Sequence, residues 1–273
     1  MSKILDTIKN EDTCVELVHE YFNGKYSKDD VKILLYQFNP MGNLNVRRGV
    51  ARLSEEWNKL KSYDKDTVTN WYKETDFYIF DLLPWNACSM FTDKMELIYK
   101  VLEGYKVQSL LDYGGGLGIS TFLLKERFPD MFITYSDFQT GNQFKFCEFL
   151  MKKLSITGIH TMDVDLALNN ISHKDAVLAM DCFEHIPDLG TTLKKLLRGT
   201  NLLIHDSTFH RNEAQPQHVN DQGEFWFVNL MLENNFYMPS NDFRVFRRFK
   251  MQLQQTGELA MMFYDPRDDI YGV

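Results

Sequence analysis

The sequence lacks the features of a membrane or secreted protein. No apolar run approaches the ~20 residues that a transmembrane helix needs. The nearest candidate, residues 77–85, is interrupted by Asp81 and Pro84. The N-terminal residues Met-Ser-Lys-Ile-Leu-Asp also lack the apolar core of a secretion signal. We therefore expect a cytoplasmic protein that has no membrane partner.

Cysteine is scarce, which argues against a structural zinc site and against a disulfide framework. The four cysteines are far apart in the sequence, and none belongs to a C-x-x-C pair: Cys14, Cys88, Cys147 and Cys182. Zinc sites and disulfide frameworks both need closely patterned ligands or partners. Four free thiols, mostly buried, are the expected state.

Positive charge is also in deficit. The 30 Lys and Arg residues are outnumbered by 38 Asp and Glu residues, which gives a formal net charge of −8. The basic runs at 194–198 and 244–250 are short and interrupted by apolar residues. Since a polyanion binds to a basic surface, we expect no nucleic-acid partner.

The first 105 residues carry a helical pattern. Apolar residues recur at spacings of three and four, as at Ile4, Ile8, Val15 and Val18. Breaks between helices are expected at 23–24, 39–42 and 84–86, where Gly or Pro occurs. No strand-like alternation precedes residue 107. We predict an all-helical cap domain over residues 1–105, placed to cover a substrate.

The remaining residues, 106–273, show the alternation of strands and helices that builds a parallel sheet. Short apolar runs mark strands at 107–111, 132–136, 158–162, 176–180 and 202–205. Crossover helices are expected at 119–128, 142–154, 189–198 and 224–234. Two further segments, 243–253 and 259–264, flank the turn 254–257 and are expected to form an antiparallel hairpin that closes the sheet. The predicted fold is α/β, a Rossmann-like doubly wound sheet behind a helical cap.

A glycine-rich turn follows the first strand. Residues 109–120 read S-L-L-D-Y-G-G-G-L-G-I-S, with glycines at Gly114, Gly116 and Gly118. Glycine permits positive φ and has no Cβ, so a ligand can lie against the loop and the following helix N-terminus. The dinucleotide pattern G-x-G-x-x-G/A fails, because Ile119 or Thr121 stands at its third position. A tight turn alone would not need three glycines in five positions.

The order D-x-G-x-G-x-G resembles motif I of class I S-adenosyl-L-methionine (SAM)-dependent methyltransferases, whose loop surrounds the amino-acid part of SAM. A second strand ends in Asp137, 19 residues beyond Gly118, and Phe138 follows it. In the resembled family this acid binds the ribose hydroxyls. The competing interpretation is that Asp137 caps the helix near Asn142. Asp112, at the end of the first strand, is a turn residue, an anchor of the loop, or a ligand of the cofactor ammonium.

Two more stretches extend the resemblance. The third strand ends in Asp163 and Val164, where the family often places an acid and a backbone donor for adenine; Asp165 is the rival acid. The fourth strand and its continuation, 175–188, are similar to the F-D-x-V-x-x-x-x-x-L-E-H-x-x-D stretch of small-molecule methyltransferases. Met180 and Asp181 would then border the methionine part of the cofactor. The sequence departs from the pattern at Lys174 and Tyr113, where the family usually has an aromatic and an aliphatic residue.

Histidines supply the candidate catalytic groups. His185 follows Glu184 at the rim where substrates of open α/β sheets bind, and a histidine can act as a general base near neutral pH. The Glu-His pair is alternatively a structural signature. His205 ends the fifth strand, and His210 and His218 follow in a polar loop. They are surface histidines, or they line the acceptor site or bind a metal together with oxygen ligands. Their spacings match no established ligand pattern, so we predict no metal site.

Aromatic residues gather in the stretch 71–85 of the cap. They form the apolar face of cap helices, or some contact the cofactor. Tyr72 and Tyr78 are the candidates for the second role, because a ring attracts the sulfonium and a hydroxyl can bind the cofactor carboxylate.

The resemblance implies transfer of a methyl group from SAM to an O, N or S nucleophile, less readily a carbon, of a small molecule, with S-adenosyl-L-homocysteine (SAH) as product. We expect the acceptor between cap and sheet, in small-molecule or natural-product metabolism. The alternatives are a SAM-utilising enzyme that cyclises the aminobutyryl arm or rearranges a substrate, and a catalytically silent SAM-binding regulatory subunit. An NAD-dependent dehydrogenase is the competitor at the level of fold. The acceptor and the oligomeric state stay open.

Overall fold

A computed structural model describes residues 2–38, 48–171, 174–207, 209, 217–220, 223–238, 245–248, 250–253 and 259–262. Only the backbone is described at 38, 48–52, 224 and in the last three strands. The expected breaks at 39–42 and 254–257, and His210, lie outside the described residues.

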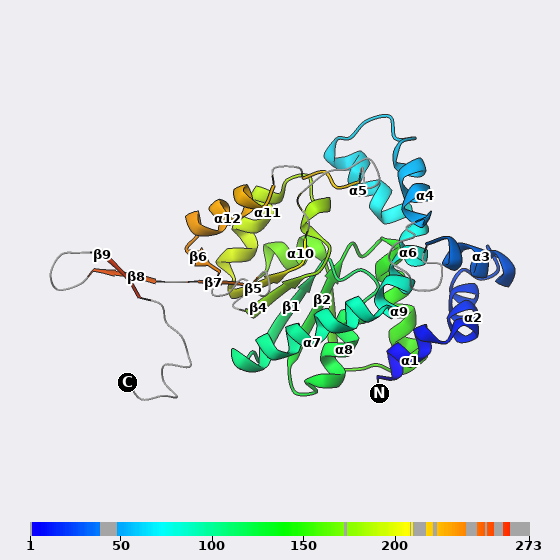
Figure 1. Ribbon diagram of the computed structural model, residues 1–273, viewed down its shortest axis with the longest axis horizontal. Helices are drawn as coiled ribbons and strands as arrows, with labels where there is room; N and C mark the ends of the chain where they lie inside the picture. The colour runs from blue at the N-terminus through cyan, green and yellow to red at the C-terminus, as the bar shows by residue number, and fades with distance from the viewer. Residues whose placement is uncertain are drawn as a thin grey trace.

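A seven-stranded sheet with the order β3-β2-β1-β4-β5-β7-β6 forms the centre of the molecule (Figure 1). β1 to β5 are parallel, whereas β7 is antiparallel to both β5 and β6. The strands are β1 (Ser109–Tyr113), β2 (Phe132–Asp137), β3 (Ile159–Asp163), β4 (Lys174–Ala179), β5 (Thr200–His205), β6 (Phe236–Tyr237) and β7 (Val245–Arg248). The predicted doubly wound sheet is confirmed. Its strand order reverses between β1 and β4, which is where open α/β sheets bind ligands.

Helices cover both faces because strand side chains alternate between them. In β1, Leu110 is buried in one core with α8 (Ile119–Arg127) and α9 (Asn142–Leu154). Its neighbour Leu111 is buried in the other core with α10 (Val164–Asn169), α11 (Leu189–Arg198) and α12 (Gly223–Glu233). A short 3-10 helix, η2 (Phe183–His185), follows β4. The two apolar cores hold the parallel strands between two layers of helices.

The described part of residues 1–105 is helical, as predicted. Its helices are α1 (Lys3–Lys9), α2 (Glu11–Tyr21), α3 (Lys28–Phe38), α4 (Arg48–Trp57), α5 (Lys65–Glu74), α6 (Phe77–Ala87) and α7 (Ser89–Gly104). Residues of α1, α2, α6 and α7 share the apolar core of α8 and α9, so these helices add to one layer of the sheet. The division into domains at residue 105 stays a prediction.

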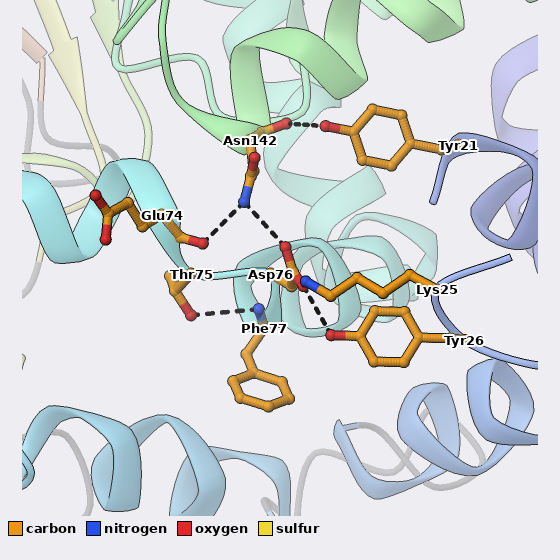
Figure 2. A network of polar contacts seen from close by, with 8 residues as sticks. All are labelled: Tyr21, Lys25, Tyr26, Glu74, Thr75, Asp76, Phe77 and Asn142. Carbon is orange, nitrogen blue, oxygen red and sulfur yellow. Dashed lines mark hydrogen bonds and ion pairs between the residues drawn. The ribbon is translucent and has the colours of Figure 1, made fainter. Parts of the chain in front are cut away.

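A polar network fixes the joint between α5 and α6 to the rest of the molecule (Figure 2). The carboxylate of Asp76 accepts hydrogen bonds from Asn142 Nδ2 at 3.0 Å and Tyr26 Oη at 2.7 Å, and pairs with Lys25. Tyr21 Oη donates to the carbonyl of Asn142 at 3.0 Å. Because Asn142 begins α9, this network ties the turn after α2 and the α5–α6 joint to the sheet layer.

Two expectations about the fold are wrong. α6 continues through Pro84 and ends at Ala87, so the break falls at Cys88. Proline removes one helical hydrogen bond, and the helix extends only three residues beyond it. Part of the predicted segment 243–253 does join the main sheet, as β7 antiparallel to β5, but the hairpin of β8 (Lys250–Leu253) and β9 (Leu259–Met262) forms a separate two-stranded sheet. Figure 1 shows it extending away from the main sheet, which is completed by β7 and β6 instead.

None of the described helices has both the length and the apolar composition needed to cross a membrane.

Candidate cofactor and acceptor site

The glycine loop between β1 and α8 is a bare stretch of backbone. Gly114, Gly116 and Gly118 have φ values of 67°, 56° and 75°, in the left-handed region that disfavours side chains. A Cβ on Gly114 would overlap Cys182 Sγ, whereas one on Gly116 would meet only the end of the Leu82 side chain, at 3.3 Å. Gly114 is therefore required by packing against Cys182, whereas Gly116 leaves the loop backbone accessible from the cavity.

Asp112 lies beneath this loop and anchors it. Its carboxylate is fully buried and accepts hydrogen bonds from Ser120 Oγ at 2.8 Å and Thr121 Oγ1 at 2.5 Å. Burial raises the pKa of Asp112, while the two hydroxyl donors oppose that rise. Of the roles expected for Asp112, the structure places it as the anchor of the loop, away from the cavity lining.

Asp137 stands at the end of β2 and is bonded to the loop. Its carboxylate accepts from Gly116 N–H at 2.8 Å and from Phe138 N–H at 2.7 Å. Burial raises its pKa to about 6, although both backbone donors act in the opposite direction. α9 begins after Gly141 with no side-chain cap, so the interpretation of Asp137 as a helix cap is wrong.

A cavity of about 640 Å³ opens above the glycine loop, between α5, α6 and the carboxyl ends of the strands. Nine of the candidate residues from the sequence line it: Tyr72, Tyr78, Gly114, Gly116, Asp137, Phe138, Val164, Asp181 and His185. Lining residues that sequence reasoning missed include Asp81, Leu82, Gln143, Leu168, Thr192 and Gln217. The volume is typical of a small-molecule site.

The third strand places its acids differently from the expectation. Asp163 turns away to cap α10, accepting from Asp165 N–H at 3.0 Å and from Gln139 N–H at 3.0 Å. Asp165, the rival, lines the cavity together with Val164. α10 itself was missed, although an Asp cap followed by apolar residues at Val164 and Leu168 was a usable signal.

Tyr72 connects the cap to the segment after β4. Its hydroxyl donates to the carbonyl of Gln217 at 2.9 Å and lies 2.9 Å from His185 Nδ1. The Tyr72 and Tyr78 rings stack with centroids 5.4 Å apart. Burial raises the pKa of both tyrosines and lowers the pKa of His185, so all three groups are held neutral.

Besides Asp112 and Asp163, three more candidates do not belong to the cavity lining: Gly118, Met180 and His205. His205 is 2% exposed, accepts from Ser207 N–H at 3.2 Å through Nδ1, and packs its ring against Phe183 and Phe227. Met180 is half-buried against the apolar core of the first layer. His218 does reach the cavity, where its ring lies 4.9 Å from that of His185. Glu184, His185 and His218 thereby form a cluster that the spacing of the sequence did not indicate.

Comparison with known proteins gives the class of fold. No protein-family profile matches the chain, and no curated protein does. Among solved structures, an O-methyltransferase described as putative, from Nostoc punctiforme PCC 73102, superposes with a TM-score of 0.53 at 12% identity, over 86% of this chain and 72% of the other. An O-methyltransferase family protein from Burkholderia thailandensis gives 0.51 at 11% identity, over 84% and 75%.

A third structure, magnesium protoporphyrin IX methyltransferase from Synechocystis PCC 6803 with bound SAH, gives a TM-score of 0.50 at 13% identity, over 72% of this chain and 97% of the other. Likeness at such identities is a likeness of fold. The chain has the Rossmann-like fold of these methyltransferases, with the sheet order and the glycine loop described above.

Proposed function

We propose that the protein is a class I SAM-dependent methyltransferase that acts on a small-molecule acceptor. The observation that carries this proposal is the junction of Asp137 with the glycine loop. A carboxylate bonded to Gly116 N–H faces a cavity of about 640 Å³ whose floor has no side chain at Gly114 or Gly116. Such a floor accepts a flat nucleoside and an amino-acid arm side by side.

The residues present fit SAM. Gly114 and Gly116 would bind the amino-acid arm through their backbone groups, because neither residue has a side chain between the backbone and the cavity. A Cβ on Gly114 would overlap Cys182, and a Cβ on Gly116 would enter the cavity beside Leu82. Asp137 has unused lone pairs beside its two backbone bonds, so it would accept both ribose hydroxyls. Phe138, Val164 and Asp165 would surround the adenine.

When bound, SAM supplies a methyl carbon that bonds to the acceptor's nucleophile as the carbon–sulfur bond breaks, and the electron pair of that bond stays on sulfur. The chain's own residues position the acceptor and limit access of water, because α5 and α6 line the cavity above the strand ends. A proton on the nucleophile must leave. His185 is the group for this task, since it is neutral and lies in the cavity wall.

Binding of SAH is the first test. Thermal shift and calorimetry with SAH and with NAD should show stabilisation by SAH alone. Asp137→Ala should abolish it, whereas Asp130→Ala, at an exposed turn before β2, should not. Stabilisation by NAD instead of SAH would refute the assignment.

Product analysis is the second test. Incubation with methyl-labelled SAM and candidate acceptors should yield SAH and a labelled acceptor. Methylthioadenosine as product would show cyclisation of the aminobutyryl arm, and binding without turnover over a broad set of acceptors would favour a regulatory SAM-binding subunit. We also propose a cytoplasmic location and a role in small-molecule or natural-product metabolism, which fractionation and metabolite profiling of a deletion strain would check.

A further inference from the structure

Three side chains with metal-binding atoms meet beside the cavity, and two of them, His185 and His218, line it. Glu184 and His185 are consecutive in η2, and His218 comes from the segment 217–220. One ligand atom from each lies within 4.8 Å of the other two. Glu184 is 0% exposed and His218 is 3% exposed, so these are not surface groups that meet by chance.

Backbone and amide hydrogen bonds hold His218 against η2. The N–H groups of Val219 and Asn220 donate to the carbonyl of Glu184, at 2.9 and 3.2 Å. Asn220 Nδ2 also donates to the carbonyls of Phe183 and Ile186, at 2.7 and 2.6 Å. The segment that carries His218 is therefore fixed at the same place as the other two ligands, and the arrangement is preorganised.

Hydrogen bonds also orient the ring of His185. The single hydrogen of the Tyr72 hydroxyl is donated to the carbonyl of Gln217. His185 Nδ1 then carries a hydrogen, which faces Tyr72 Oη at 2.9 Å and the Gln217 carbonyl at 3.3 Å. His185 Nε2 is then the nitrogen with a free lone pair. Metal-binding histidines characteristically donate their other ring N–H to an oxygen in this way.

A buried oxygen in the same cavity lining has no hydrogen-bond partner among the residues that the structure describes. Gln217 is 4% exposed, lines the same cavity, and its Oε1 makes no hydrogen bond among the described residues. Left unsatisfied, such an atom is costly, and a ligand or a metal-bound water would satisfy it.

We propose that Glu184, His185 and His218 bind a divalent transition metal ion in the cavity wall. Two imidazoles and one carboxylate suit Zn²⁺, Fe²⁺ or Mn²⁺ and leave coordination positions open, whereas Mg²⁺ and Ca²⁺ prefer oxygen ligands. Donors around one such ion lie about 3–3.5 Å apart, so the cluster closes slightly on binding. This site revises the expectation, drawn from the sequence, of no metal.

The site also defines the class of acceptor, and this part rests on the proposed function. His185 and His218 line the same cavity as Gly114 and Gly116, so an acceptor with a hydroxyl or enol oxygen would be within reach of an ion held by these residues. An ion held by Glu184, His185 and His218 would lower the pKa of that oxygen, so that its proton would be lost to water as the acceptor binds, before the site excludes water for methyl transfer. The metal then takes the task that His185 would perform as a base, and the reaction is O-methylation.

Metal binding is tested without any methyl-transfer assay. Full-length protein, purified without a chelator or a nickel column, should contain one equivalent of metal by mass spectrometry. After removal of the metal, Co²⁺ should bind with a visible d–d spectrum and be displaced by Zn²⁺. His218→Ala and Glu184→Gln should weaken Co²⁺ binding at least 100-fold. His160→Ala, at an exposed position on β3, should bind Co²⁺ like the wild type.

Tyr72→Phe keeps the test decisive if the ligand variants fail to fold. It removes one hydroxyl and should weaken Co²⁺ binding 10–100-fold, as loss of an orienting partner does. A folded wild-type protein that binds SAH but neither contains metal nor binds Co²⁺ would overturn the proposal and leave Glu184 and His218 as a structural pair. Binding of Co²⁺ without binding of SAH would instead refute the proposed function and leave the metal site standing.

Discussion

Gly116 and Gly24 provide a matched pair for separating ligand binding from backbone strain. Both have positive φ, 56° and 80°. A Cβ at Gly24 would meet nothing within 4 Å, and one at Gly116 would meet only Leu82 Cδ1 at 3.3 Å, at the end of a flexible side chain. Gly116 lines the cavity, whereas Gly24 lies in the turn after α2. Alanine at either position should therefore have a similar effect on folding and a different effect on the ligand.

The left-handed conformation costs an L-residue about 1–2 kcal/mol. For a chain of this size each kcal/mol lowers the melting temperature by about 2–4 °C, so both variants should melt about 2–8 °C below the wild type. Gly116→Ala should in addition weaken SAH binding by about tenfold or more, which corresponds to about 1.4 kcal/mol. The added methyl occupies the surface against which the cofactor arm lies.

Circular dichroism gives the two melting temperatures, and calorimetry with SAH gives the two dissociation constants. Gly116 does not contact the ligand if folded Gly116→Ala binds SAH with wild-type affinity. The same conclusion follows if Gly24→Ala loses as much affinity as Gly116→Ala, because backbone strain alone would then explain both losses.

Other residues give further predictions. SAH affinity should fall about tenfold per pH unit below 6, because protonation of Asp137 removes the acceptor of the ribose hydroxyls. The raised pKa of Asp137 has the opposite effect on stability: its contribution is full below about pH 4 and is lost as the pH rises through 6. Titrations of binding and of unfolding from pH 4.5 to 7.5 check both trends. Asp112→Ala should lower the free energy of unfolding by about 1–3 kcal/mol in urea melts, because it leaves two buried hydroxyls unpaired. Asn142→Ala should speed hydrogen exchange at the α5–α6 joint, since it removes the bond to Asp76, and unchanged exchange there would contradict the role of the network in Figure 2. His205→Gln should change stability but leave kcat unchanged, because the ring lies behind Phe183, and a large loss of kcat in a folded variant would restore it as a catalytic candidate.

The sequence predicts well which residues meet at the carboxyl ends of the parallel strands. Successive strands of such a sheet deliver their carboxyl ends to one edge, so Gly116 and Asp137 meet although 21 positions separate them. Periodicity likewise predicts the helical N-terminal region, because an amphipathic helix must bury one side.

The sequence predicts less well what depends on single hydrogen bonds. Whether Asp163 or Asp165 faces the cavity is decided by which of them caps α10, a helix of only six residues. The meeting of His218 with Glu184 depends on the amide of Asn220, which no periodicity reveals. The hairpin β8–β9 was placed in the sheet because alternation marks strands but does not tell which partner they pair with.

Calorimetric titration of the purified protein with SAH at pH 7.5 decides whether the glycine loop and Asp137 form a SAM site. We expect one site per chain in the wild type, and no measurable heat of binding in folded Asp137→Ala. Absence of binding to the folded wild type, for SAH and for SAM alike, would contradict this expectation.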